Sequence, residues 1–128
     1  MRTGSQIYAP VVLRSGLTIL FLWFGFSQVL SPDMWTSWVP EWASSILGLD
    51  ARTIVLLNAS LEIVGGVFLA FGFWTRWVAL LLGLHLLGIA CEIGLSAIGV
   101  RDFALAVSTL ALSLFGGDVW TLDGRMKQ

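Results

Sequence analysis

Four long apolar stretches run along the chain, separated by shorter polar segments. They cover about residues 11–30, 53–73, 77–98 and 102–117. A helix needs about 20 mostly apolar residues to cross the hydrocarbon core of a bilayer. The last stretch reaches that length only together with its flanking residues. The pattern therefore predicts a single domain, residues 1–128, folded as an all-α integral membrane four-helix bundle.

Prolines and a glycine mark the expected ends of these spans. Pro10 precedes the first span, Pro32 follows it, and Gly99 interrupts the pattern between the third and the fourth. Proline is tolerated at a helix start and cannot continue a helix, so these positions suit span boundaries. No small-residue cleavage site follows the first apolar run, which we therefore interpret as a membrane helix and not as a cleaved signal peptide.

The longest connection, residues 31–52, is rich in tryptophan. It places Trp35, Trp38 and Trp42 among polar residues, and Pro32 and Pro40 resemble helix starts. Tryptophan is enriched where a membrane meets water. We expect a short interfacial helical loop between the first and second spans. Its tryptophans form either a belt at the membrane surface or a lid over a cavity.

Basic residues are distributed unequally between the two ends of the predicted bundle. The end that holds both termini and the second connection carries Arg2, Arg14, Arg76, Arg125 and Lys127, and the opposite end carries Arg52 and Arg101. Short cytoplasmic segments are enriched in Lys and Arg. We therefore expect a multi-pass protein of the cell (plasma) membrane with both termini in the cytoplasm.

Composition agrees with a membrane protein and excludes several other classes. The chain is 57% hydrophobic and only 12% charged, whereas soluble domains carry about 25% charged residues. Its net charge is −1 and its basic residues are scattered, which excludes a nucleic-acid partner. The single cysteine, Cys91, excludes an internal disulfide or a cysteine-based zinc site.

Each apolar stretch carries a stripe of small and polar residues at helical spacing. The stripes are Arg14, Thr18, Phe21, Gly25 and Gln28; Asn58, Glu62, Gly65 or Gly66, Leu69 and Gly72; His85, Gly88, Glu92, Ser96 and Gly99; and Asp102, Ala106, Thr109 and Ser113. Ionisable groups inside a bilayer cost at least about 2.5–3.5 kcal/mol on insertion scales, so they tend to face the bundle interior and to have partners. The four stripes are therefore expected to enclose a polar interior.

Most of the ionisable groups fall in the half of the bundle next to the tryptophan-rich loop, and His85 falls near the midplane. The candidate ligand-binding residues are Gln28, Glu62, His85, Glu92, Arg101 and Asp102. We expect Arg101 to pair with one of the glutamates. Arg14 lies nearer the other end and is expected to extend to the cytoplasmic interface.

Three interpretations of this cluster stay open. Arg101 with Glu62 or Asp102 pins the helices together; or the cluster lines a cavity for a ligand such as a quinone; or His85 and Glu92 conduct protons. The spacing of Glu62, Glu92 and His85 is not a metal-binding pattern, so no metal site is expected. No nucleotide-binding loop, nucleophile elbow or zinc motif is present, and no catalytic residue can be assigned.

At these residues the chain resembles the DoxX family of small four-helix membrane proteins. The resemblance rests on Glu62-x-x-Gly65-Gly66-x-x-Leu69-x-x-Gly72-x-x-Thr75-Arg76, on Arg14 and Gly25, on Arg101-Asp102, and on Gly117-Asp118-x-x-Thr121-Leu122-Asp123. It covers about residues 14–123. Family members often carry a Lys in the region where this chain has Gln28, which removes one cation from the cluster.

The resemblance implies a range of functions. The family is named after a subunit of an archaeal thiosulfate:quinone oxidoreductase, another relative is a scaffold that assembles with superoxide dismutase and a sulfurtransferase, and distant relatives are cargo receptors or assembly chaperones. We expect a membrane subunit or scaffold of a redox or sulfur-metabolism complex, with a quinone or lipid-like ligand among the candidate residues. The alternative is a non-enzymatic assembly factor that binds other membrane proteins. Whether the chain is an enzyme, and whether it forms a homo-oligomer, stay open.

Overall fold

The computed structural model describes residues 2–126, so Lys127 of the charge count lies outside the described residues. Its elements are α1 (Gly4–Leu30), η1 (Pro32–Met34), η2 (Thr36–Trp38), α2 (Glu41–Leu47), α3 (Ala51–Phe71), α4 (Thr75–Ile93), α5 (Ala97–Phe115) and α6 (Leu122–Met126). The described residues contain no strand. Helices α1, α3, α4 and α5 are long and apolar enough to cross a membrane. The predicted all-α membrane four-helix bundle is confirmed.

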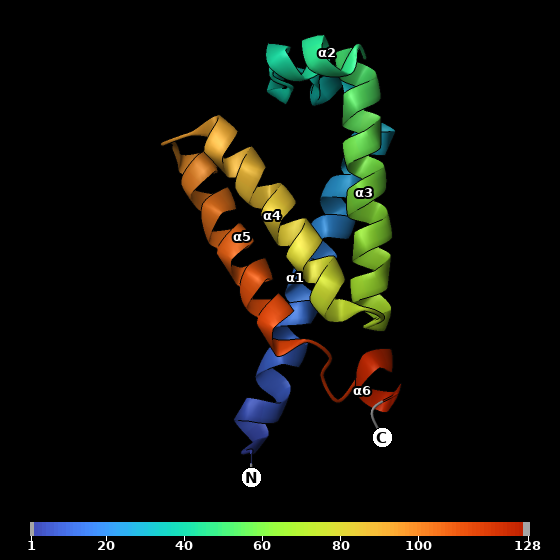
Figure 1. Cartoon of the computed structure of the whole chain (residues 1–128), viewed down its shortest axis with the longest axis vertical. Coiled ribbons are helices and arrows are strands. Elements are labelled where there is room, and N and C mark those ends of the chain that lie inside the picture. Colours follow the sequence, from blue (N-terminus) through green and yellow to red (C-terminus); the bar gives the residue numbers. More distant parts are fainter. Residues whose placement is uncertain (1, 127–128) are drawn as a thin grey trace.

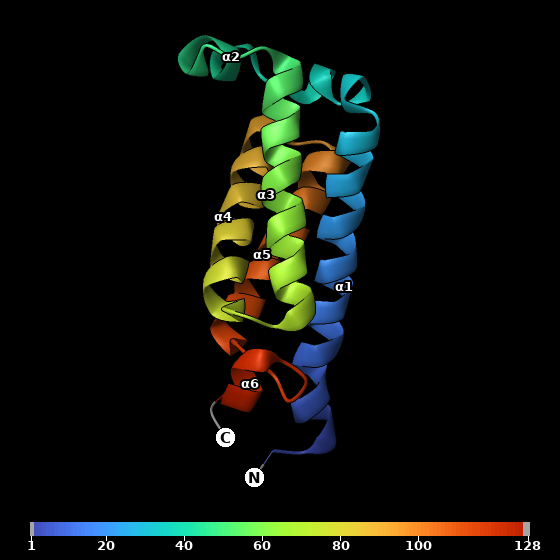
Figure 2. The same ribbon diagram turned by 90° about the vertical axis from the view of Figure 1, so that its right-hand side faces the viewer.

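The four long helices form two closely packed pairs. Helix α1 packs along α3, and α4 packs along α5, with much less contact between the pairs. Figure 1 shows the pairs meeting near the α3–α4 turn and diverging toward α2, and Figure 2 shows α3 in front of the other spans. We call the end that holds both termini and α6 the terminal end, and the end that holds η1, η2 and α2 the loop end.

The first helix begins earlier than predicted. Thr3 caps α1, because its hydroxyl accepts a hydrogen bond from the Gln6 backbone N–H while the Gln6 side chain accepts one from the Thr3 N–H. This reciprocal capping box stabilises a start at Gly4. Pro10 therefore lies inside α1 and not before it. The expectation that proline marks the start was wrong, since a local cap outweighs its preference for the first turn.

The boundary between the last two spans also differs from the prediction. Helix α4 ends at Ile93, where Gly94 adopts a left-handed φ of 81°. Ser96 then caps α5 by accepting a hydrogen bond from the Gly99 N–H over 3.0 Å. Gly99 consequently lies in the first turn of α5 instead of separating the spans. Helix α5 thereby gains the length to span the membrane.

Two glycines let α1 approach α3 closely. A Cβ added at Gly25 would lie 2.6 Å from Cγ1 of Ile63, and one added at Gly66 would lie 2.8 Å from Cδ2 of Leu22. Glycine permits such close helix contact in membranes because it has no side chain. This contact brings Gln28 of α1 against Glu62 of α3.

The loop end consists of the short helices that were predicted. Figure 1 shows α2 lying across this end of the bundle. Trp35 packs edge-on against Phe24 of α1, with ring centroids 5.7 Å apart. Trp38 and Trp42 are 51% and 56% exposed, which agrees better with a belt at the membrane surface than with a closed lid.

Candidate functional site

A buried carboxylate at membrane depth is the centre of the candidate site. Glu62 lies in the middle of α3 and is 5% exposed. Its Oε2 accepts a hydrogen bond from Nε2 of Gln28 over 3.0 Å, and its Oε1 accepts one from Nδ2 of Asn58 over 3.1 Å. Neutral amides from two helices therefore surround this carboxylate.

Asn58 connects this carboxylate to a third helix. Its Nδ2 also donates to Oε1 of Gln28 over 2.8 Å, and its Oδ1 lies 2.5 Å from Nε2 of His85 on α4. Because Nδ2 of Asn58 faces two oxygen atoms, Oδ1 must face His85, and Nε2 of His85 must carry the proton. We call Gln28, Asn58, Glu62 and His85 the polar network.

Arg101 does not pair with a glutamate, contrary to the prediction. Its Nη2 lies 3.3 Å from Oδ1 of its chain neighbour Asp102, and its side chain is 54% exposed. Asp102 itself is buried on α5. Arg101 sits one position further round the helix and extends outward, because adjacent helical residues point about 100° apart.

Glu92 is not brought into the polar network either. It lies in the last turn of α4 and is exposed. The prediction placed Glu92 and His85 on one inward stripe of a helix that continues to residue 98. Because the helix pairs diverge toward the loop end (Figure 1), His85 reaches α3 but Glu92, seven residues further along α4, does not.

Arg14 forms a second buried polar cluster, at the terminal end. Its Nε donates to Oδ2 of Asp118 over 2.8 Å, and its Nη1 donates to the backbone carbonyls of Leu69 and Ala70 over 2.8 and 3.1 Å. Arg14 is only 5% exposed. The expectation that it extends to the membrane interface was wrong, because these acceptors at the end of α3 and in the tail satisfy the guanidinium internally.

The C-terminal tail, residues 116–126, closes this end of the bundle. Oδ1 and Oδ2 of Asp123 accept hydrogen bonds from the backbone N–H groups of Trp74 and Thr75 over 2.9 and 2.6 Å, at the start of α4. The Asp123 N–H donates to the carbonyl of Gly72 over 3.0 Å. The Arg14 cluster and the tail thus fasten α1, α3 and α4 together, which is a structural role.

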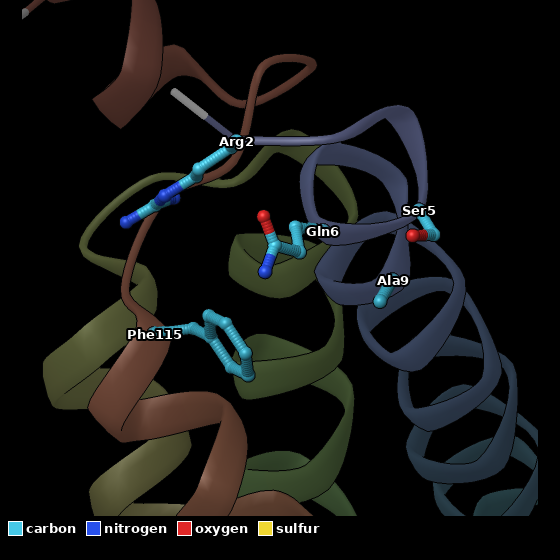
Figure 3. A pocket seen from close by; sticks show the side chains of 5 residues that line it. All are labelled: Arg2, Ser5, Gln6, Ala9 and Phe115. Atoms are coloured by element: carbon cyan, nitrogen blue, oxygen red, sulfur yellow. The ribbon is translucent and has the colours of Figure 1, made fainter.

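Two open hollows lie at the terminal end, away from the polar network. The larger, about 530 Å³, lies between the start of α1 and the end of α5 and is lined by Arg2, Ser5, Gln6, Ala9 and Phe115 (Figure 3). The smaller, about 330 Å³, shares Arg2 and Phe115 with it. Every residue that lines the larger hollow is exposed, so it is a feature of the surface and not an enclosed site. Within residues 2–126, no group of three or more His, Cys, Asp or Glu residues is arranged to hold a metal ion.

A family comparison agrees with this architecture. The family model DoxX matches residues 9–98, which is more than half of the chain. The chain belongs to the DoxX family. The match includes all four residues of the polar network, but it ends before Arg101 and before the tail. No match was found among curated proteins, and none was found among solved structures.

The structure singles out Asn58 as the residue that sequence reasoning missed. It was on the expected stripe, four residues before Glu62, but not among the candidate ligand residues. In this DoxX protein it is the only described residue that contacts both Glu62 and His85 through side-chain hydrogen bonds. Asn58 and His85 are half-buried, so the polar network reaches the protein surface between α3 and α4.

Proposed function

We propose that this DoxX protein is a membrane subunit or scaffold of a redox or sulfur-metabolism complex, and that its polar network holds the head group of a quinone or lipid-like ligand. The observation that carries the proposal is Glu62, a buried carboxylate at membrane depth. Among the described residues, no ion pair involves Glu62. Intramembrane carboxylates without an ionic partner are costly and commonly mark ligand or proton sites.

Packing of α1 on α3 does not require this carboxylate. Gly25 and Gly66 already hold the two helices in close contact, and a single amide pair would add a hydrogen bond without a charge to desolvate. The polar network also extends to the less tightly packed seam between the helix pairs. A role in binding explains both the cost of Glu62 and the position of His85 at the seam.

The fit of a quinone can be tested against the residues present. A quinone has an apolar tail, suited to the bilayer around α3 and α4, and a polar ring with two oxygen atoms. His85, Asn58 and Glu62 offer hydrogen-bonding groups at one edge of the bundle. When bound, a quinone would supply two-electron redox chemistry to a partner complex, and the residues of this chain would bind and orient its ring.

Extraction of the purified protein provides the test. The protein is isolated in mild detergent, extracted with organic solvent and analysed by mass spectrometry for quinones and lipids. We expect a retained ligand in the wild type and its loss in Glu62→Gln. Glu92→Gln is the matched control, because Glu92 is an exposed carboxylate outside the polar network, and it should retain the ligand.

The competing function, a non-enzymatic assembly factor, gives a different result. It predicts a co-purifying membrane protein and no ligand that depends on Glu62. An extract with equal ligand content in the wild type and in Glu62→Gln, each folded by circular dichroism, would contradict the proposed site. We further propose that the protein resides in the plasma membrane with both termini in the cytoplasm.

A further inference from the structure

The hydrogen bonds of the polar network all point toward Glu62. Nε2 of His85 donates to Asn58, Nδ2 of Asn58 donates to Gln28 and Glu62, and Nε2 of Gln28 donates to Glu62. An ionised carboxylate only accepts hydrogen bonds, whereas a carboxamide carries one accepting and one donating side. Glu62 therefore sets the direction in which both amides are oriented.

Gln28, Asn58 and Glu62 form a closed triangle that a carboxyl group satisfies and a carboxamide does not. Nδ2 of Asn58 donates to Oε1 of Gln28 and to Oε1 of Glu62. The remaining side-chain atoms of these two residues, Nε2 of Gln28 and Oε2 of Glu62, bond to each other. With Gln at position 62, either orientation of Asn58 forces two donors or two acceptors into contact. The carboxylate at position 62 thus fixes Nδ2 of Asn58 toward the triangle and Oδ1 toward His85.

This arrangement determines which nitrogen of His85 is available to a ligand. Because Oδ1 of Asn58 accepts from Nε2, the proton of neutral His85 is on Nε2, and Nδ1 is an acceptor. Glu62 is a further acceptor and is already bonded to Gln28 and Asn58. Arg101, the cation expected here from the sequence, extends outward from α5, so the network itself offers few free donors.

We infer that Glu62, acting through Asn58, holds His85 in the Nε2–H tautomer, so that the site selects head groups that donate hydrogen bonds. For a quinone-type ligand this means the hydroxyl groups of the reduced quinol in preference to the carbonyl groups of the oxidised quinone. The inference rests on the proposed function, and it adds which oxidation state of the ligand the site prefers. Glu62 and Asn58 are positioning residues here, and His85 makes the contact.

Nitrogen-15 NMR and ligand titration test the two halves of the inference. His85 is the only histidine, so its ring nitrogens are observed without overlap in histidine-labelled protein. The wild type should show Nε2–H alone. Decylubiquinol should bind about tenfold more tightly than decylubiquinone, a difference that a single hydrogen bond can supply. Glu62→Gln and Asn58→Ala should mix the tautomers, and Asn58→Ala should reduce that ratio toward one, while Glu92→Gln should preserve both results.

The outcomes separate this inference from the proposed function. Equal binding of the two probes, tighter binding of decylubiquinone, or an Nδ1–H tautomer in the wild type would overturn the inference and leave a ligand site in place. Binding of neither probe, together with no extracted ligand, would overturn the proposed function and the selectivity with it. Asn58→Ala keeps the Gln28–Glu62 hydrogen bond, so it provides the test even where Glu62→Gln does not fold.

Discussion

Arg14 of α1 and Asp118 of the C-terminal tail form a buried ion pair across 104 positions of the sequence, with Nε and Oδ2 2.8 Å apart. Their side chains are 6% and 0% exposed. The other arginine contacts, with the carbonyls of Leu69 and Ala70, tie the same guanidinium to the end of α3. One side chain therefore joins the first span, the second span and the tail.

Removal of one partner of this pair should be strongly destabilising. Asp118→Ala leaves the Arg14 charge buried without its carboxylate, which costs about 3–5 kcal/mol for a buried pair. Arg52→Ala is the matched control, because Arg52 pairs with Asp33 at the surface, with side chains 57% and 77% exposed, and surface pairs contribute about 0–1 kcal/mol. Tryptophan fluorescence during unfolding in detergent measures both. Equal losses in the two variants would show that Arg14 is not held as the structure describes.

Two glycines with nearly the same backbone conformation allow the cost of left-handed backbone strain to be measured separately from the cost of a steric clash with the tail. Gly48 has φ 66° and Gly72 has φ 69°, but a Cβ at Gly48 meets nothing within 4 Å, whereas one at Gly72 would collide with Thr121. Gly48→Ala should cost about 1–2 kcal/mol for the left-handed backbone. Gly72→Ala should cost about 1–3 kcal/mol more, the range for overpacking. Thermal unfolding compares them, and equal losses would mean that the tail does not pack against this turn.

The sequence predicted the parts of the fold that depend on local pattern. The four spans and the short helical loop follow from apolar length and from tryptophan and proline positions. The burial of Gln28 and Glu62 also follows, because each residue lies on the small, polar stripe of its helix. Such stripes show which face of a helix is buried, but not which neighbour covers it.

Contacts between distant segments could not be predicted in that way. Nothing local to Arg14 indicates an acceptor 104 positions away. The exposure of Glu92 follows from the divergence of the helix pairs toward the loop end (Figure 1), which depends on long-range packing. The end of α4 at Gly94 was also missed, because the apolar pattern continues past it. A better signal was present in Ser96, which is a typical helix N-cap residue and bonds the Gly99 N–H. It would have placed the start of α5 correctly.

The start of α3 should depend on pH. Asp50 caps this helix at the loop end, and hydrogen bonds from the side chain and then the backbone of Thr53 lower its pKa below the usual 3.8. A carboxyl whose pKa is lower in the folded state stabilises that state above its unfolded pKa, and the contribution is lost as the pH falls through the folded pKa. We therefore expect the first turn of α3 to lose protection from hydrogen exchange as the pH falls from about 5 to about 2.

Asp50→Asn is the control for this prediction. Asparagine accepts the same hydrogen bond from the Thr53 N–H but does not titrate, so protection of the first turn, after correction for intrinsic exchange, should vary less with pH in the variant than in the wild type. An identical pH dependence in the two proteins would assign the effect to another group.

The structure revises the count of basic residues on which the proposed membrane orientation rests. Arg14 is buried in the Arg14–Asp118 pair, so it does not contribute to the positive charge of the terminal end as an interfacial residue would. Arg2, Arg76 and Arg125 remain exposed there, against Arg52 and Arg101 toward the loop end. The terminal end therefore still carries more basic residues than the loop end, although the excess is smaller than the sequence alone indicates. Short basic segments stay in the cytoplasm, so the proposed orientation is unchanged.

Cysteine labelling on intact cells measures this orientation. In a Cys91→Ser background, Ser37→Cys reports on the loop end and Val119→Cys on the tail, since both positions are exposed and neither change alters a charge. A membrane-impermeant maleimide should label position 37 in intact cells and position 119 only after permeabilisation. The reverse pattern would place the loop end in the cytoplasm. A ligand or partner at the loop end would then be a cytoplasmic one.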